Sequence, residues 1–153
     1  MKRDSKLSVS LHALLHMAEQ AEPMTSEKLA ECLHTNSVVV RRTMAGLRDA
    51  GFVRSEKGHG GGWSIACDLR AVTLRDVYTA LGEPGLFAIS NRTETPECLV
   101  EQSVNAVLRD AFRDAEALLV DRLGSVSLSD LSARFHRRLL RYKQKQRSST
   151  HAF

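Results

Sequence analysis

The stretch SVVVRRTMAGLRDAGFVRSEKGHGGGWSIA, residues 37–66, decides the fold because it joins a helical pattern directly to a hairpin pattern. In its first half Val40, Met44 and Leu47 recur at three- and four-residue steps, the spacing of the buried face of a helix. Gly51 is suited to end that helix, since glycine adopts the left-handed conformation common at helix C-termini. The first half therefore predicts one amphipathic helix.

The second half predicts a β-hairpin with a glycine-rich loop. Residues 52–55 and 63–66 read as strands, and the second alternates apolar with polar side chains. Four of the seven residues between them are glycines, which lets the backbone take positive φ angles and approach another surface closely. We therefore expect a thin hairpin that directly follows a helix.

The same loop contains His-Gly-Gly-Gly, residues 59–62, which also occurs as the oxyanion loop of esterases. Such an esterase needs a Gly-x-Ser-x-Gly nucleophile elbow, which this sequence lacks, and no Gly-Lys-Ser/Thr follows the glycines to make a phosphate loop. At 153 residues the chain is also short for a hydrolase sheet. We therefore expect no enzyme and no catalytic residues.

Upstream, two further helices are predicted. Residues 5–20 have helical apolar spacing and end before Pro23, and a shorter helix begins after the capping hydroxyl of Thr25. Only a few residues then lead to the helix that starts at Ser37. Two helices joined by a tight turn, followed by a hairpin, predict a winged helix-turn-helix whose last helix can enter a DNA major groove.

The second half of the chain predicts mostly helix. A short helix begins at Thr73, a long amphipathic helix covers 98–123, and a last helix begins near residue 127. We expect a mainly α fold with a small β-hairpin, in which a winged helix-turn-helix domain at 1–81 is followed by a loop at 82–97 and by dimerisation helices with a basic tail at 98–147. The long helix either pairs with a copy of itself or packs along its own domain. Its candidate dimer contacts are Val104, Val107, Ala111, Ala115 and Leu118.

Charge is unevenly distributed along the chain, whose formal net charge is +4. Residues 82–133 carry four basic and nine acidic side chains, whereas 134–147 carry seven basic and no acidic ones. The basic segment either contacts DNA phosphates or is a solvated helix end with a frayed tail.

No apolar run approaches a membrane span or a secretory signal, and the odd number of cysteines, three, argues against a disulfide framework. We therefore expect a cytoplasmic protein without membrane contact.

Double-stranded DNA is the partner that this pattern favours, although a basic helix face by itself is often only solvated. On the recognition helix the outward side is basic, and the hairpin brings further cations on a thin loop that can reach phosphates or a narrow minor groove. The candidate DNA-binding residues are Ser26, Asn36, Ser37, Val38, Arg41, Arg42, Arg48, Arg54, Lys57 and His59.

Three segments together carry a family resemblance. VVVRRTMAGLRDAGFVRS, KGHGGGWSIA and VTLRDVYTA resemble the Rrf-two family of bacterial transcriptional regulators, the IscR, NsrR and CymR type. SLSDL at 127–131 is similar to the start of the family's last helix. The resemblance implies a homodimer that binds an inverted repeat, as two-fold symmetry requires of the DNA. Arg41 stands where cluster-binding members have a base-reading glutamate, which implies a preference for guanine, and Lys57 replaces the usual wing arginine.

The effector region departs from the cluster-binding members. They carry three closely spaced cysteines before the long helix, and this chain has only Cys98 there. Because an iron–sulfur cluster needs about four protein ligands, we expect no cofactor. The chain resembles instead the cluster-free, YwnA-like branch of the family, which has a single cysteine before the long helix. Cys98 is a candidate redox switch, since a thiol at a helix N-terminus has a lowered pKa, or else a helix-start residue with no signalling role.

Two functions from different classes remain besides the rejected enzyme. The first is a DNA-binding regulator, expected to repress transcription in response to thiol redox state or a small ligand. The second is a winged helix used as a protein-interaction module, because a fold does not fix a function.

Overall fold

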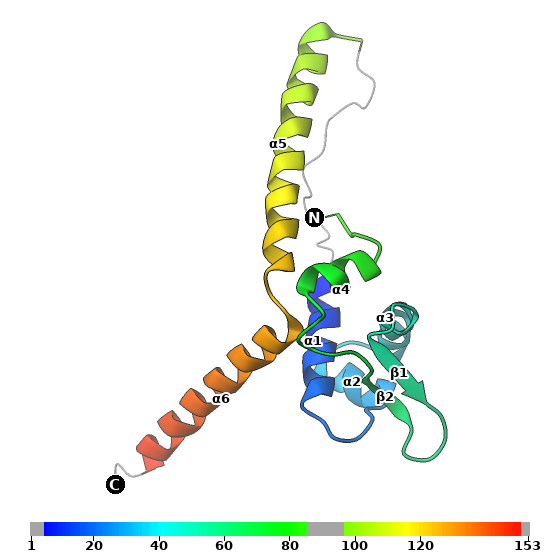
Figure 1. Cartoon of the computed structure of the whole chain (residues 1–153), viewed down its shortest axis with the longest axis vertical. Helices are drawn as coiled ribbons and strands as arrows, with labels where there is room; N and C mark the ends of the chain where they lie inside the picture. The colour runs from blue at the N-terminus through cyan, green and yellow to red at the C-terminus, as the bar shows by residue number, and fades with distance from the viewer. Residues whose placement is uncertain (1–4, 86–96, 151–153) are drawn as a thin grey trace.

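The computed structural model describes residues 5–85 and 97–150, with side chains up to residue 147. The elements in chain order are α1 (Lys6–Ala18), α2 (Ser26–Cys32), α3 (Ser37–Asp49), β1 (Val53–Glu56), β2 (Gly62–Ile65), α4 (Leu74–Ala80), α5 (Leu99–Gly124) and α6 (Leu128–Thr150). Figure 1 shows a head made of α1 to α4 and the hairpin, from which α5 and α6 project in different directions. The fold is mainly α with one small hairpin, as the sequence predicts.

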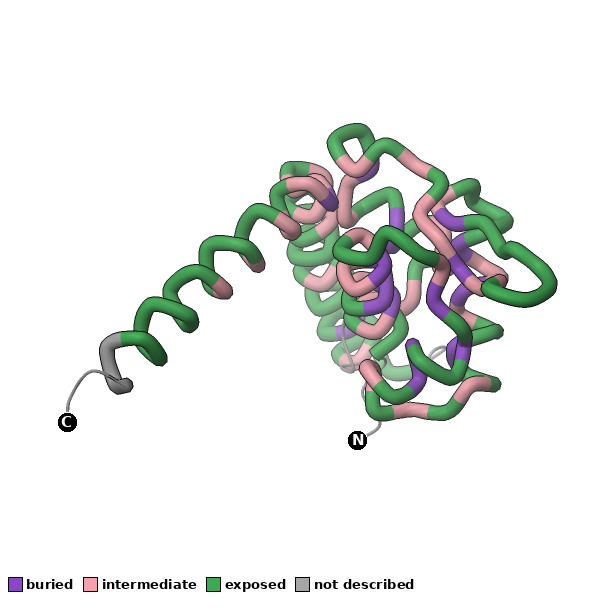
Figure 2. Tube along the Cα trace, turned by 90° about the horizontal axis from the view of Figure 1, so that it is seen from below, coloured by how far each residue is buried: buried purple, intermediate pink, exposed green. Residues whose placement is uncertain are grey.

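The core lies inside the head, between α1, α2, α3 and α4. Leu14, Leu29, Val40, Met44 and Leu47 are almost completely buried there. Burial of one such side chain stabilises the fold by about 1.5–3 kcal/mol, so these helices are held mainly by their shared apolar faces. Buried positions cluster in the head, whereas the two projecting helices are mostly exposed along their length (Figure 2).

The hairpin is anchored to the head at the base of β2. β1 and β2 are antiparallel, with Val53 opposite Ile65. The Trp63 N–H donates to the Met24 carbonyl at 2.8 Å, and the Met24 N–H donates to the Trp63 carbonyl at 2.9 Å. A Cβ on Gly62 would lie 2.5 Å from the Met24 carbonyl oxygen, so this close approach requires glycine. The Trp63 side chain is buried and packs against the core of the head.

The joint between α5 and α6 is bonded to the head through the segment that precedes α4. The Leu74 N–H donates to the Val126 carbonyl at 2.9 Å, and the Leu128 N–H donates to the Val72 carbonyl at 2.9 Å. A third bond joins the Ser129 N–H to the Leu69 carbonyl at 2.8 Å. These bonds hold the start of α6 in place although α5 itself projects away from the head.

α6 continues as a helix through the basic segment to Thr150. A frayed tail is one of the two alternatives that the sequence allows for this segment. No glycine or proline interrupts this segment, and leucine, arginine, lysine and glutamine are good helix formers. Most of the loop expected before the long helix, residues 86–96, lies outside the described residues.

Candidate nucleic-acid interface

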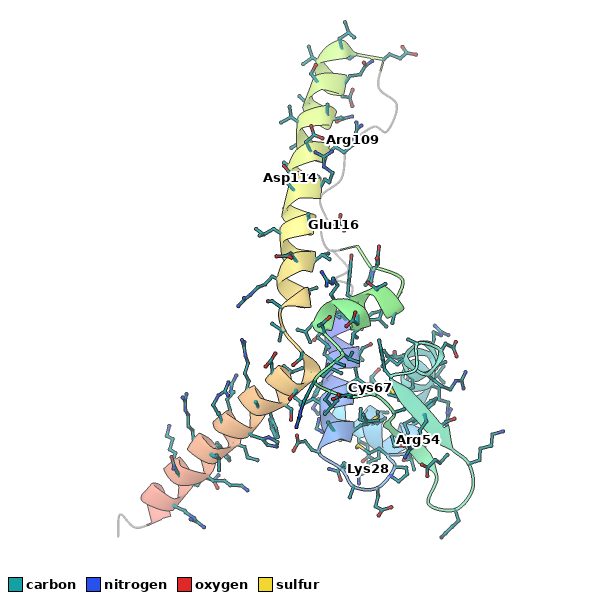
Figure 3. All side chains as sticks on the ribbon, in the orientation of Figure 1. Lys28, Arg54, Cys67, Arg109, Asp114 and Glu116 are labelled. Atoms are coloured by element: carbon teal, nitrogen blue, oxygen red, sulfur yellow. The ribbon has the colours of Figure 1, made fainter. Side chains whose placement is uncertain are left out.

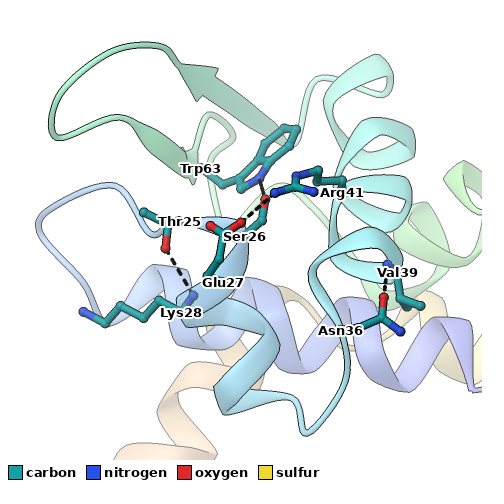
Figure 4. A network of polar contacts seen from close by, with 8 residues as sticks. All are labelled: Thr25, Ser26, Glu27, Lys28, Asn36, Val39, Arg41 and Trp63. Carbon is teal, nitrogen blue, oxygen red and sulfur yellow. Dashed lines mark hydrogen bonds and ion pairs between the residues drawn. The ribbon is translucent and has the colours of Figure 1, made fainter.

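A short turn joins α2 to α3, and a side chain caps the start of each of these two helices. Thr25 Oγ1 accepts a hydrogen bond from the Lys28 N–H at 3.1 Å, and Asn36 Oδ1 accepts one from the Val39 N–H at 3.0 Å (Figure 4). Caps of this kind stabilise a helix by about 1 kcal/mol each. They fix where α3 begins and therefore which of its side chains face outward.

The outward face of α3 is basic. Arg41, Arg42 and Arg48 are exposed, while Ser37 is half-buried at the first turn. Val38 and Val39 are 58% and 39% exposed, so the first turn of α3 also presents apolar surface. The exposed side of the helix therefore combines three guanidinium groups with two exposed valine side chains.

Arg41 is held by an acidic residue of the preceding helix. Its Nη2 lies 2.6 Å from Glu27 Oε1, and the two side chains are 55% and 62% exposed (Figure 4). Exposed ion pairs contribute only about 0–1 kcal/mol, so a DNA group can replace Glu27 at little cost. The sequence analysis missed this pair, because the residues are 14 positions apart on different helices and no periodicity connects them.

The hairpin tip carries two more ionisable side chains. Lys57 and His59 are exposed there, beside Gly58 and Gly60 with φ angles of 92° and 77°. Behind the tip, Arg54 Nε lies 3.3 Å from Glu56 Oε1 on the same strand. The tip is thus a thin cationic loop, and the arginine behind it is partly neutralised.

Ser26 does not belong to the exposed interface. Its side chain is buried, and its Oγ accepts a hydrogen bond from the Trp63 indole N–H at 3.0 Å (Figure 4). The hydroxyl group therefore joins α2 to β2 through this hydrogen bond. Asn36 remains exposed, but its side-chain oxygen is engaged as the α3 cap.

α5 presents an apolar stripe without a partner in the described chain. Val104, Val107 and Leu118 are 50%, 69% and 73% exposed, and Ala111 and Ala115 between them are exposed as well. Steps of three and four residues keep all five side chains on one side of the helix. The sticks in Figure 3 project from α5 into open space along most of its length.

Cys98 is the exposed N-cap residue of α5. The backbone N–H groups of Glu101 and Val100, in the first turn of α5, lower the pKa of its thiol. By contrast, burial raises the pKa of the Cys67 thiol, which packs in the head (Figure 3). The two cysteines therefore differ in thiolate content at the same pH.

Comparison with protein families gives one match that covers most of the chain. The Rrf2 (Rrf-two) family model, described as an iron-dependent transcriptional regulator, matches residues 3–134. The chain belongs to the Rrf2 family. YwnA of Bacillus subtilis, described as an HTH-type transcriptional regulator, is an Rrf2-like relative with 31% identity over 129 residues, which are 84% of this chain and 95% of YwnA.

Solved structures confirm the Rrf2 fold. A transcriptional regulator from Lactobacillus plantarum has a TM-score of 0.72 at 23% identity, covering 93% of this chain and 98% of its own. IscR of T. potens has a TM-score of 0.64 at 21% identity, covering 86% and 85%. CymR of B. subtilis, described as the global cysteine regulator, has a TM-score of 0.57 at 22% identity, covering 88% and 98%.

Membership of the Rrf2 family decides against the esterase alternative. The family consists of transcriptional regulators, so the chain is not an esterase. In the structure residues 57–61 form the loop that joins β1 to β2. Among the residues that the structure describes, no helix is long and apolar enough to cross a membrane.

Although the Rrf2 description names iron, the described side chains do not form an iron site. Cys98 stands at the outer end of α5, whereas Cys32 and Cys67 pack against the core of the head (Figures 1 and 3). Within 5–85 and 97–150, no three His, Cys, Asp or Glu side chains lie close enough together to hold a metal ion. An iron–sulfur centre needs about four such ligands, so this donor set does not fit one.

Proposed function

We propose that this Rrf2 protein is a homodimeric repressor that binds an inverted-repeat operator through α3 and the wing, and acts on chromosomal DNA in the cytoplasm. The observation that carries the proposal is the set of exposed cations on two adjacent elements of one head. Arg41, Arg42 and Arg48 extend from α3, and Lys57 extends from the wing tip. A major-groove helix flanked by a backbone- or minor-groove-contacting loop is the usual docking of such a head.

Homodimerisation is supported by the apolar stripe on α5. Val104, Val107 and Leu118 cost free energy when exposed to water, and a second copy of α5 would cover them. Two-fold pairing uses the same face on both copies and presents two recognition helices to DNA. The operator is therefore proposed to consist of two inverted half-sites.

Base readout is assigned to Arg41. Its guanidinium can donate two hydrogen bonds to O6 and N7 of guanine, once DNA replaces Glu27 as its partner. Asn36 and Ser37 stand at the α3 N-terminus, where backbone N–H groups and side chains bind phosphate. Arg42, Arg48, Lys57 and His59 are assigned to phosphates or the minor groove.

Regulation is assigned to Cys98 without a metal cofactor. The Cys98 thiolate would attack one oxygen of hydrogen peroxide, the O–O bond would break, and a sulfenic acid and one hydroxide ion would form. The exposed position at the start of α5 and the lowered pKa of the thiol support this assignment. Oxidation there would alter the α5 pairing and so the relative orientation of the two heads.

Titration of a random-sequence DNA duplex with purified protein over a salt series tests DNA binding without knowledge of the operator. A DNA-binding regulator should lose affinity steeply with salt, since each neutralised phosphate contributes a slope of about −0.9 in log K against log salt. Weak binding that does not change with salt would favour the protein-interaction module instead.

A further inference from the structure

A polar cleft of about 300 Å³ lies at the joint between α5 and α6. Three arginines line it: Arg122 from the last turn of α5, and Arg134 and Arg137 from α6. Ser125 adds a hydroxyl group between the two helices. The cleft therefore gathers three guanidinium groups that are distant from the wing in the sequence.

None of these three arginines has a carboxylate oxygen within 4 Å among the described residues. The ion pairs seen there include those of Arg41, Arg48, Arg54, Arg113 and His136. Three adjacent cations repel one another, and an anion between them would relieve that repulsion.

One carboxylate, Asp130, also lines the cleft, but it is engaged as a helix cap. Its Oδ2 accepts hydrogen bonds from the Ser127 N–H and from Ser127 Oγ, both at 2.9 Å. These bonds, with Arg134 as a smaller contributor, lower the pKa of the Asp130 carboxyl group. The carboxylate is therefore held at the α6 N-terminus, and the cleft keeps an excess of positive charge.

The cleft and the proposed DNA interface are formed by different elements: the cleft by the end of α5 and by α6, the interface by α3 and the wing. In Figure 1 the α5–α6 joint and the wing lie on opposite sides of α1. This separation favours a small soluble ligand over DNA as the occupant.

We propose that the cleft binds a small polyanion that carries two or more phosphate or carboxylate groups. Guanidinium groups bind both kinds of oxyanion through paired hydrogen bonds, and the cleft volume suits a small metabolite. Such a ligand would bridge α5 to α6 at a joint whose backbone is bonded to the head through Val126 and Leu128. Its role as an effector rests on the proposed function, but its binding does not.

Calorimetric titration with pyrophosphate and, separately, with citrate tests the site at physiological ionic strength. We expect saturable binding of at least one anion, weakened ten-fold or more by the double substitution Arg134→Gln/Arg137→Gln. The matched control, Arg141→Gln/Lys143→Gln, removes the same charge from exposed positions of α6 outside the cleft and should leave the affinity unchanged. No saturable binding to wild type, or an equal loss in both variants, would overturn the site.

The effector role is tested by repeating the DNA titration with the anion present. We expect a change of at least three-fold in DNA affinity for wild type and none for Arg134→Gln/Arg137→Gln. Anion binding with unchanged DNA affinity would overturn the effector role but leave the site in place. Anion binding by a protein that does not bind DNA would reject the proposed function and not the cleft.

Discussion

At the scale of single residues, the ion pair between Arg41 and Glu27 sets the orientation of the side chain that is proposed to read a base. The guanidinium is oriented before binding, since its Nη2 lies 2.6 Å from a carboxylate oxygen across the helix-turn-helix. Because both side chains are more than half exposed, water already screens the pair, and its loss costs at most about 1 kcal/mol. The proposed bidentate contact with guanine would more than compensate for that loss.

Arg41→Ala should weaken specific DNA binding by about 1–3 kcal/mol, which is roughly a 5- to 150-fold increase in Kd. The reason is the loss of the proposed contact with guanine. Fluorescence anisotropy with an operator duplex measures the change, and Glu27→Gln is the control, since it releases Arg41 without removing it. Equal affinities of wild type and Arg41→Ala would exclude this residue from base readout.

Ser26→Ala should lower the free energy of unfolding by about 1–3 kcal/mol, because it leaves the buried Trp63 N–H without its acceptor. Trp63 is the single tryptophan of the chain, so its fluorescence during urea denaturation reports the change directly. Ser8→Ala, at an exposed position of α1, is the control and should have little effect. A stable Ser26→Ala variant would mean that the bond is dispensable.

Cys98 should be alkylated by iodoacetamide at a lower pH than an ordinary cysteine. Because the pKa of its thiol is lowered, the fraction of reactive thiolate rises at a lower pH than in an ordinary cysteine. Cys67, with a raised pKa and partial burial, should react later. Mass spectrometry of the modified peptides over a pH series measures both, and the reverse order would contradict the assignment.

At the scale of elements, periodicity was sufficient to predict the helices and the hairpin. Val40, Met44 and Leu47 are all buried on α3, as their spacing predicts. Contacts between distant segments could not be predicted in the same way. Ser26 is bonded to a tryptophan that lies 37 residues away in the sequence. A residue expected at the DNA surface is therefore buried inside the head.

Val107→Glu should weaken self-association ten-fold or more, because a charge would have to be buried in the proposed α5 interface. The side chain is 69% exposed in the single chain, so the head should still fold. Ala106→Glu adds the same charge on another side of α5 and is the matched control. Sedimentation equilibrium gives both dissociation constants; unchanged association of Val107→Glu would remove α5 from the dimer interface.

At the scale of the whole molecule, the joint between α5 and α6 connects the proposed dimer helix to the DNA-binding head. The Leu74 and Leu128 backbone bonds fasten this joint to the segment that precedes α4. In sequence, Arg134 and Arg137 belong to a uniform basic run, so nothing indicates that they meet Arg122 of the preceding helix. That cleft becomes visible only when the angle between the two helices is known.

The central claim, that two heads together read an inverted repeat, is tested most directly by recovering bound DNA. Purified protein is mixed with sheared DNA from its own source at several salt concentrations, and the retained fragments are sequenced. We expect one inverted repeat to be enriched, with guanine in each half-site and retention that falls steeply with salt. Fragments without a shared repeat, under both reducing and oxidising conditions, would contradict sequence-specific binding by this protein.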